Sequence, residues 1–226
     1  MTRDHLHHHL HLQRGRRERV LRGIVAGAVV AVVGLSTFGG GADAARRTKS
    51  ATIAETAAEA VDALERWEQT LNPGDYVRFV QQRDLAASMT ETDIELADGA
   101  LRDSWAGVPL TKQHAVLGAV SQLGVPYRSI ASEPGVGFDC SGLTIWAFGE
   151  AGVEIPRVSR DQINDSDAIE REQAVAGDLV YYPGHVSIYV GADMMVHSPN
   201  SGSHVEVTWL PEKSLRFGDA VSAAAD

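Results

Sequence analysis

The 226-residue sequence contains a single cysteine, Cys140. One thiol cannot form an internal disulfide, so a disulfide-stabilised scaffold is excluded. The fold must depend on a hydrophobic core instead, and a chain of this length can bury a full-sized one. The apolar and charged fractions are those of a soluble domain with extensions.

Basic residues are too few for a polyanion-binding protein. The formal net charge is −10. The first 44 residues carry six Lys and Arg against three Asp and Glu, whereas the remainder carries 14 against 27. Phosphate binding requires a basic face, so nucleic acid is excluded as a partner.

No apolar run is long enough for an ordinary membrane span. Residues 23–38 are apolar, but about 20 residues are needed to cross a bilayer. Arginines precede this stretch, and Ala42-Asp43-Ala44 follows it, which is the layout of a secretory signal. We predict a leader over residues 1–44, cleaved after Ala44. The alternative is an uncleaved anchor formed by residues 23–38, and either reading places the rest of the chain outside the cytoplasm. The histidine-rich tract between His5 and His11 is interpreted as solvated leader, not as a metal site.

Residues 50–72 lack internal glycine and proline and carry one apolar stripe at helical spacing. The stripe consists of Ile53, Ala57, Ala60, Leu64, Trp67 and Leu71. Asn72-Pro73-Gly74 ends this helix, and further apolar clusters predict two or three helices over 50–105. We therefore assign 45–110 as a helical segment or linker, which packs on the next domain and could restrain its cleft.

Residues 111–218 form the predicted catalytic domain, in which the period of the pattern changes from helical to alternating. Helices are expected from Thr111, a candidate N-cap, to Gly124, over 140–151, and from Ser159 as N-cap. Short strands follow at 178–182, 185–190, 194–198 and 205–210. Helices followed by a strand meander predict an α+β fold, with N-terminal helices packed on a short antiparallel sheet. Residues 219–226 are expected to be a tail, frayed from Val221 onward.

Cys140 lies where a loop gives way to a helix. The unpaired N–H groups and positive end of a helix stabilise a thiolate over a thiol. Cys140 is therefore a candidate nucleophile. The alternative is a small buried apolar side chain, which is the commonest role of a free cysteine.

Two histidines follow on adjacent predicted strands. His185 shares its strand face with Ser187 and Tyr189. A three-residue Gly191-Ala192-Asp193 loop, or a compensating bulge, would place His197 on that same face, whereas a two-residue loop alone would reverse it. His185 can then take the proton of Cys140, and His197 can orient His185. His114 and His204 lack such a setting and are interpreted as surface residues.

A zinc site made of the same cysteine and two histidines is the alternative chemistry. Structural zinc usually draws ligands from C-x-x-C or H-x-x-x-H pairs, and Cys140, His185 and His197 form neither. We therefore expect no metal and no cofactor. The Cys140 N–H, with the Tyr127 hydroxyl, is a candidate oxyanion donor.

Several ordered motifs resemble the NlpC/P60 family of papain-like cell-wall peptidases. They extend over about residues 111–217, and several such pieces in order are far more specific than any one alone. In chain order they are Leu123-Gly124-Val125-Pro126-Tyr127, Phe138-Asp139-Cys140-Ser141-Gly142-Leu143, Pro156-Arg157-Val158-Ser159-Arg160-Asp161-Gln162, Ala176-Gly177-Asp178-Leu179-Val180-Tyr181-Tyr182, Gly184-His185-Val186-Ser187-Ile188-Tyr189-Val190-Gly191 and Met195-Val196-His197-Ser198-Pro199.

The resemblance implies a secreted cysteine peptidase that cuts peptide stems of bacterial peptidoglycan, typically between D-glutamate and a diamino acid. It implies Cys140 as nucleophile, His185 as base and His197 as the orienting residue. Tyr127 matches a tyrosine near the oxyanion, and Asp139 and Ser141 match residues that contact the stem peptide. The chain departs from the family at Arg128-Ser129-Ile130, which replaces the usual Trp-Gly-Gly, and 45–110 contains no recognisable wall-binding repeat.

Two other functions fit the same residues. One is a thiol amidase or acyltransferase on this scaffold, which the bond cut would distinguish. The other is a non-catalytic envelope binding module, in which Cys140 would have ordinary thiol reactivity. We expect peptidoglycan stem peptides as partners, membrane contact only through an uncleaved leader, and a monomer.

Overall fold

The computed structural model describes residues 41–224, which all fall in one compact unit. The leader predicted over 1–44 therefore lies outside the described residues, apart from its last four positions. The same holds for the tract between His5 and His11 and for the apolar stretch 23–38. Within the described part, no helix is both long and apolar enough to cross a membrane.

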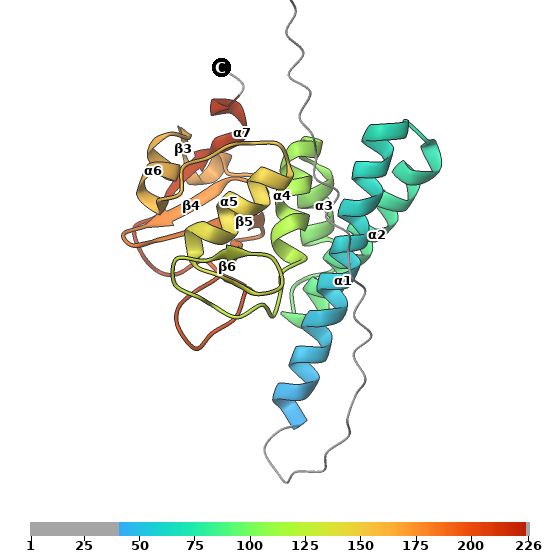
Figure 1. Cartoon of the computed structure of the whole chain (residues 1–226), viewed down its shortest axis with the longest axis horizontal. Helices are drawn as coiled ribbons and strands as arrows, with labels where there is room; N and C mark the ends of the chain where they lie inside the picture. Colours follow the sequence, from blue (N-terminus) through green and yellow to red (C-terminus); the bar gives the residue numbers. More distant parts are fainter. Residues whose placement is uncertain (1–40, 225–226) are drawn as a thin grey trace, which may run out of the picture. The chain divides into compact units, whose positions relative to one another are not determined.

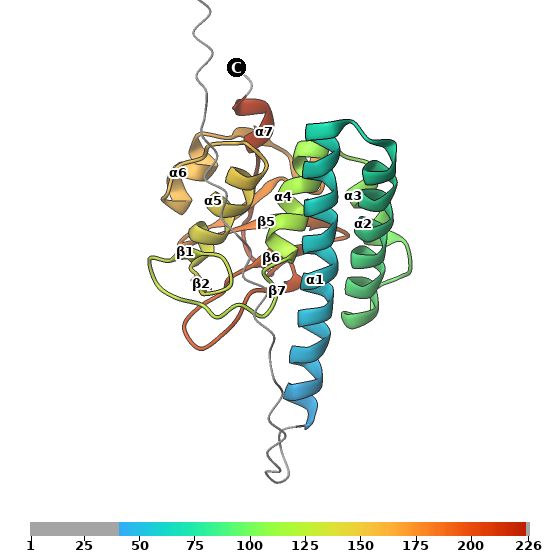
Figure 2. The same ribbon diagram turned by 45° about the vertical axis from the view of Figure 1, so that its right-hand side comes forward.

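Three helices make up the predicted helical segment: α1 (Gly41–Thr70), α2 (Pro73–Asp93) and α3 (Ala100–Ala106). Figures 1 and 2 show α1 and α2 side by side, joined by a tight turn. Asn72 caps α2, because its side chain accepts a hydrogen bond from the Gly74 N–H at 2.9 Å. The stop predicted at Asn72-Pro73-Gly74 is thus confirmed, although α1 begins earlier than residue 50.

The apolar stripe of α1 is buried along most of its length. Ile53, Ala57, Ala60 and Leu64 lie in the core, and Trp67 is half-buried. Leu71 was predicted to continue the stripe, but this is wrong: its side chain is 70% exposed. Leu71 has a φ of 55°, which takes the chain out of the helix before its side chain can reach the core.

Helix α4 (Leu110–Val120) lies between the helical segment and the rest of the predicted catalytic domain. The N-cap position is Pro109, so the prediction of Thr111 as the cap is wrong by two residues. Pro109 fits there because its fixed φ favours a helix entry. His114 was predicted at the surface, but it is buried, 4% exposed, on the part of α4 that approaches Glu65 of α1.

Helices α5 (Cys140–Glu150) and α6 (Ser159–Asn164) complete the helical layer. Helix α5 begins at the predicted residue and packs against the sheet (Figure 1). For α6 the N-cap is Val158 instead of the predicted Ser159, and Ser159 is the first helical residue.

The main sheet has six strands in the order β3-β8-β4-β5-β6-β7, all paired antiparallel. The strands β4 to β7 confirm the predicted meander and, with the helices, the predicted α+β class. The sequence analysis did not anticipate β3, β8 or the small β1-β2 sheet. The bounds are β1 Ser132–Glu133, β2 Gly137–Phe138, β3 Asp167–Ile169, β4 Leu179–Tyr182, β5 His185–Gly191, β6 Met194–His197, β7 Glu206–Trp209 and β8 Arg216–Asp219, with a 3₁₀ turn η1 at Arg171–Gln173.

The β5–β6 hairpin uses a two-residue turn together with a bulge. Gly191 pairs with Met194 across the turn Ala192-Asp193, where both turn residues have positive φ. The register shifts at Val190, so that Tyr189 pairs with Met195. The three-residue loop is therefore wrong, whereas the compensating bulge is confirmed. The extra residue restores the alternation that a two-residue turn alone would invert.

The end of the described chain is ordered, contrary to the frayed tail predicted from Val221. Residues Ala220–Ala223 form a short helix, α7, capped by Asp219. The Asp219 side chain accepts hydrogen bonds from the N–H groups of Val221 and Ser222. It also receives the buried Lys112 ammonium at 2.8 Å, so the ion pair ties this end to α4.

Candidate active site

The first turn of α5 presents Cys140 at the surface of the sheet domain, where its side chain is half-buried. Asp139 is the N-cap, and its side chain accepts a hydrogen bond from the Gly142 N–H at 2.6 Å. The helix begins at Cys140 because this carboxylate satisfies an N–H group that no helical carbonyl can reach. The thiol therefore lies at the positive end of α5.

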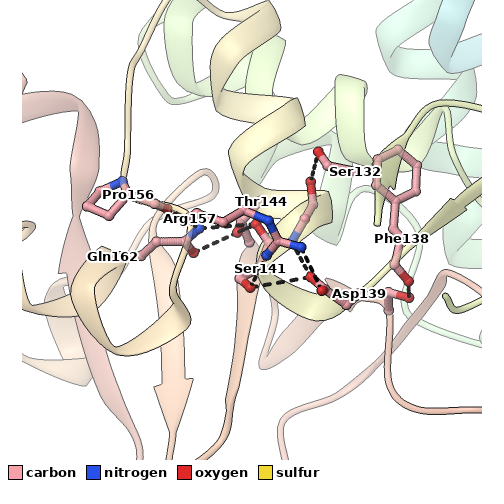
Figure 3. Close-up of polar contacts among 10 residues, drawn as sticks. Ser132, Phe138, Asp139, Ser141, Thr144, Pro156, Arg157 and Gln162 are labelled. Atoms are coloured by element: carbon pink, nitrogen blue, oxygen red, sulfur yellow. Dashed lines mark hydrogen bonds and ion pairs between the residues drawn. The ribbon is translucent and has the colours of Figure 1, made fainter. Parts of the chain in front are cut away.

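Arg157 binds the residues on both sides of Cys140. Its guanidinium donates to the Ser141 hydroxyl and to the Asp139 carboxylate, each at 2.7 Å. Figure 3 shows the guanidinium between these two side chains. A planar group with several fixed donors can hold two partners at once, which fixes the rotamers of both neighbours of the nucleophile.

Gln162 and Thr144 hold α6 against the same turn of α5. The Thr144 hydroxyl donates to Gln162 Oε1 at 2.7 Å. Gln162 Nε2 in turn donates to the Ser141 carbonyl at 3.1 Å and to the Pro156 carbonyl at 2.8 Å (Figure 3). Both side chains are buried, so the arrangement is shielded from competing water.

The loop before Cys140 lies directly against the helix start. The Asp139 N–H donates to the Ala131 carbonyl at 3.1 Å, and the Ser132 hydroxyl donates to the Gly142 carbonyl at 2.8 Å. A Cβ on Gly142 would overlap the Ala131 carbonyl oxygen. Glycine is therefore required at this position by the close backbone approach.

Ser198 connects the nucleophile loop to the histidine strands. Its buried hydroxyl donates to the Phe138 carbonyl at 2.7 Å. Because Ser198 follows His197 and Phe138 precedes Cys140 by two residues, this bond joins the end of β6 to the entry of α5.

His185 and His197 lie on the same face of the sheet, in contact with each other. His185 Nε2 and His197 Nδ1 are 2.9 Å apart, and the two rings meet edge to face with 5.0 Å between their centroids. Both residues are buried, at 5% and 6% exposure. The Nε2 atom of His185 is occupied by this contact, which leaves Nδ1 as the nitrogen available to a thiol.

Burial lowers the pKa of His185 to about 4, with smaller contributions from His197 and Lys213. The imidazole is thus neutral at ordinary pH and can accept a proton. Tyr182 stacks on His185 with 4.9 Å between ring centroids, and the Lys213 ammonium lies 4.2 Å from the centre of the Tyr182 ring. Burial raises the pKa of Tyr182, and Cys140 raises it further, which places the thiol within electrostatic range of the Tyr182–His185 stack.

The other predicted site residues belong to the framework around Cys140. Tyr127 is half-buried and pairs with Phe138 in an isolated bridge. The side chains of Asp139 and Ser141 are engaged by α5 and Arg157 as described above. Their predicted contacts with a stem peptide, and that of Tyr127 with an oxyanion, remain predictions.

No group of three or more His, Cys, Asp or Glu side chains between residues 41 and 224 is arranged to hold a metal ion. Chemically, a thiol at a helix start and a pair of hydrogen-bonded imidazoles can act as a nucleophile and its base.

Sequence reasoning missed Arg157, Gln162, Tyr182 and Lys213. Arg157 and Gln162 stood in a quoted motif, Pro156–Gln162, but nothing in their spacing showed that both would bind the first turn of α5. Tyr182 immediately precedes the β4–β5 turn, and its distance of three residues from His185 was the available signal. Lys213 lies on a connecting segment and left no signal.

The segment that carries the candidate site also matches a known protein family. Residues 124–216 match the model of the NlpC/P60 family, and this segment contains every site residue named above. Residues 124–216 of the chain are therefore an NlpC/P60 domain.

Curated relatives are similar over the same region. The chain is 41% identical over 92 residues to the bifunctional muramidase/DL-endopeptidase CwlT of Bacillus subtilis, covering 37% of this chain and 28% of CwlT. It is 35% identical over 127 residues to the murein DD-endopeptidase MepH of Escherichia coli, covering 51% and 47%. The peptidoglycan endopeptidase RipB of Mycobacterium tuberculosis is 37% identical over 126 residues, covering 49% and 52%. The chain thus spans about half the length of these relatives, or less.

Among solved structures, the P60 domain of antigen MAP1204 from M. avium subspecies paratuberculosis is 31% identical to this chain. The alignment covers 50% of this chain and 96% of that domain, with a TM-score of 0.45.

Proposed function

We propose that this protein is a cysteine endopeptidase that hydrolyses the peptide stems of bacterial peptidoglycan, outside the cytoplasm. The observation that carries the proposal is the joint placement of one thiol at a helix start and two hydrogen-bonded histidines on the facing strands. The printed names of its relatives, which are peptidoglycan endopeptidases, supply the substrate class.

In the proposed reaction, His185 takes the proton of Cys140 and the thiolate attacks the carbonyl carbon of the scissile amide. The attraction between thiolate and imidazolium offsets part of the cost of a buried charge. The resulting oxyanion faces the N–H of Cys140 at the start of α5. Tyr127 is the second candidate donor.

The amide C–N bond then breaks, and His185 returns its proton to the leaving amine. This leaves a thioester on Cys140. Water attacks the thioester as His185 accepts a proton from it, and the C–S bond breaks to release a carboxylic acid and the free thiol. His197 holds the His185 ring by accepting a hydrogen bond from Nε2.

The bond we propose is that between D-glutamate and the diamino acid. The relatives' names include both DL- and DD-endopeptidases, so a cross-link bond is the second candidate. Purified cell wall digested with the protein, followed by chromatography and mass spectrometry of the muropeptides, identifies the bond. The same products distinguish an amidase or acyltransferase.

The matched control for this digest is Cys140→Ala, which removes the nucleophile and leaves the Asp139 cap intact. We expect product formation to fall about a thousandfold or more. Undiminished cleavage by Cys140→Ala would refute the proposal. A binding module is distinguished by iodoacetamide: rapid alkylation of Cys140 at mildly acidic pH supports an activated thiol, and slow alkylation supports the module.

A further inference from the structure

The outer nitrogen of His197 has no hydrogen-bond partner within 3.5 Å in the described part of the chain, although it is buried. Its Nδ1 atom is engaged by His185, but Nε2 is inaccessible to solvent and unpaired. A buried polar atom without a partner is costly, so such an atom indicates a missing interaction or an interaction that is nearly formed.

Glu206 is the group toward which this atom points. His197 and Glu206 are directly paired across β6 and β7, so their side chains stand side by side on one face of the sheet. His197 Nε2 and Glu206 Oε1 are 3.6 Å apart, just beyond hydrogen-bond distance. The Glu206 side chain is 55% exposed, and a movement of a few tenths of an ångström would bring its oxygen within hydrogen-bond distance of Nε2.

The chemistry of the histidine pair requires a definite proton at this position. For His185 to accept the thiol proton at Nδ1, its own proton must be on Nε2 and be donated to His197 Nδ1. A neutral His197 that accepts at Nδ1 carries its proton on Nε2. A carboxylate beside Nε2 favours this tautomer. If His197 carried its proton on Nδ1 instead, Nδ1 could not accept the hydrogen bond from His185 Nε2.

We propose that Glu206 is a positioning residue of the active site, whose carboxylate accepts the His197 Nε2 proton and so sets the tautomers of His197 and His185. In the order Cys140, His185, His197, Glu206, it supplies a carboxylate next to the third residue. A Cys-His-His triad has no such negative charge of its own. The effect of Glu206 on turnover rests on the proposed function. Its effect on the tautomers of His185 and His197 does not.

The pKa of Glu206 supports this reading. The His197 ring is the largest cause that lowers it, with smaller contributions from Arg46 of α1 and from His204. The carboxylate is therefore ionised in the range where His185 acts as a base. The other groups around the pair are Lys213 and Tyr182, which face His185 from the opposite side.

The test compares Glu206→Ala with Glu206→Gln, because glutamine keeps an acceptor oxygen and alanine does not. We expect kcat on stem peptides to fall about three- to tenfold in Glu206→Ala, with KM unchanged, and Glu206→Gln to recover part of the loss. Glu172→Ala is the matched control, since Glu172 is an exposed carboxylate in the 3₁₀ turn η1, outside the strands that carry the two histidines. Glu206→Ala with wild-type kcat would overturn the proposal.

Two readouts need no substrate. Nitrogen NMR of histidine-labelled protein, with His197 assigned by its absence in His197→Gln, should show the Nε2–H tautomer in the wild type and a mixture in Glu206→Ala. Alkylation of Cys140 should slow in Glu206→Ala. In a His197→Ala background, Glu206→Ala should cause no further loss. An unchanged tautomer, or a full additional loss in that background, contradicts the proposal.

These readouts separate the two proposals. If the wild type cleaves no stem peptide but the NMR and alkylation respond as expected, the proposed function fails and the role of Glu206 stands. If the wild type cleaves stem peptides and Glu206→Ala matches it in every readout, the role of Glu206 fails and the function stands.

Discussion

The two halves of the candidate site are held in different ways. The Cys140 half is fixed by short side-chain hydrogen bonds from Asp139, Arg157 and Gln162, which all converge on one helical turn. The histidine half depends on strand register, supported by the contact between His185 and His197 and by the hydrogen bond from Ser198 to the Phe138 carbonyl. The first half therefore depends on individual side chains, whereas the shared face of the two histidines depends on the register of the sheet.

The register itself is supported from outside the sheet. Val190, the bulged residue, accepts a hydrogen bond at its carbonyl from Trp105 Nε1 at 2.9 Å. A Cβ on the next residue, Gly191, would overlap the Ser104 side chain, so α3 lies directly on the bulge. The helical segment thus contacts the element that places both histidines on one face.

The largest expected effect is on the Cys140 half. Gly142→Ala places a methyl group on the Ala131 carbonyl oxygen, so backbone must move. We expect a loss of about 3 kcal/mol or more in unfolding free energy, with loss of activity. Chemical denaturation measures it.

The control for that substitution is Gly149→Ala in the same helix, where the added carbon would extend into open space beyond the helix backbone. This change should stabilise the protein by up to about 1 kcal/mol, because alanine favours a helix over glycine. Equal losses in the two variants would contradict the close-contact explanation.

Acid should affect two buried histidines, one inside the site and one outside it. Burial lowers the pKa of His114 to about 4 from 6.5, so the unfolded chain binds more protons between these values. Stability should therefore fall as pH falls from about 6.5 to 4, by about 3 kcal/mol for this residue. His114→Gln should weaken the pH dependence of unfolding, as chemical denaturation at a series of pH values measures. A dependence that persists in full without His114 would contradict its assigned protonation.

Trp105→Phe tests the support of the histidine half by α3. The change removes the donor to the Val190 carbonyl and leaves that buried acceptor unpaired. We expect a loss of about 2 kcal/mol in stability and reduced turnover. Trp209→Phe, at a side chain 55% exposed, is the control and should cost far less. If Trp105→Phe is less stable but turns over substrate at the normal rate, α3 does not support the position of the two histidines.

Arg157→Gln tests the hydrogen bonds around Cys140. It removes the guanidinium group that donates hydrogen bonds to Asp139 and Ser141. The Arg157 side chain is partly exposed, which limits the stability lost. We expect about 1 kcal/mol of lost stability and roughly a tenfold lower kcat, since misplacement of the nucleophile slows attack. Arg171→Gln, which breaks an ion pair between exposed side chains, should change neither. Similar kinetics in both variants would show that the Cys140 half needs no such support.

Lys213→Gln should give the smallest effect. Lys213 lowers the pKa of His185, although less than burial does. Without this charge the pKa of His185 should rise, so the acid limb of the pH–rate profile moves to higher pH. The rate at neutral pH should change by less than about threefold. A shift to lower pH would contradict the assigned influence of Lys213.

The sequence predicted those parts of the site that depend on the local pattern of apolar and polar residues. Cys140 at a helix start and the shared face of His185 and His197 followed from helical and strand periods. The bulge at Val190 could be named only as an alternative, because two turn geometries give the same face. Arg157 and Lys213 depend on how distant segments meet, which no local period encodes.

The fold likewise divides into elements that local periodicity predicts and elements that depend on contacts between distant segments. The meander β4 to β7 was predictable from alternation, whereas β3 and β8 are short strands of three and four residues that pair across a long separation. His114 was assigned to the surface because it lacks the sequence setting of His185 and His197, yet the packing of α1 on α4 buries it. Burial of this kind is a property of the contact between helices and not of either helix.

The most direct test of the account is mass spectrometry of the intact protein, quenched by acid during turnover of a stem peptide. We predict a covalent adduct on Cys140 with the mass of the acyl half of the substrate, and no adduct in Cys140→Ala. Cleavage of the same peptide by folded Cys140→Ala at the wild-type rate would contradict the account.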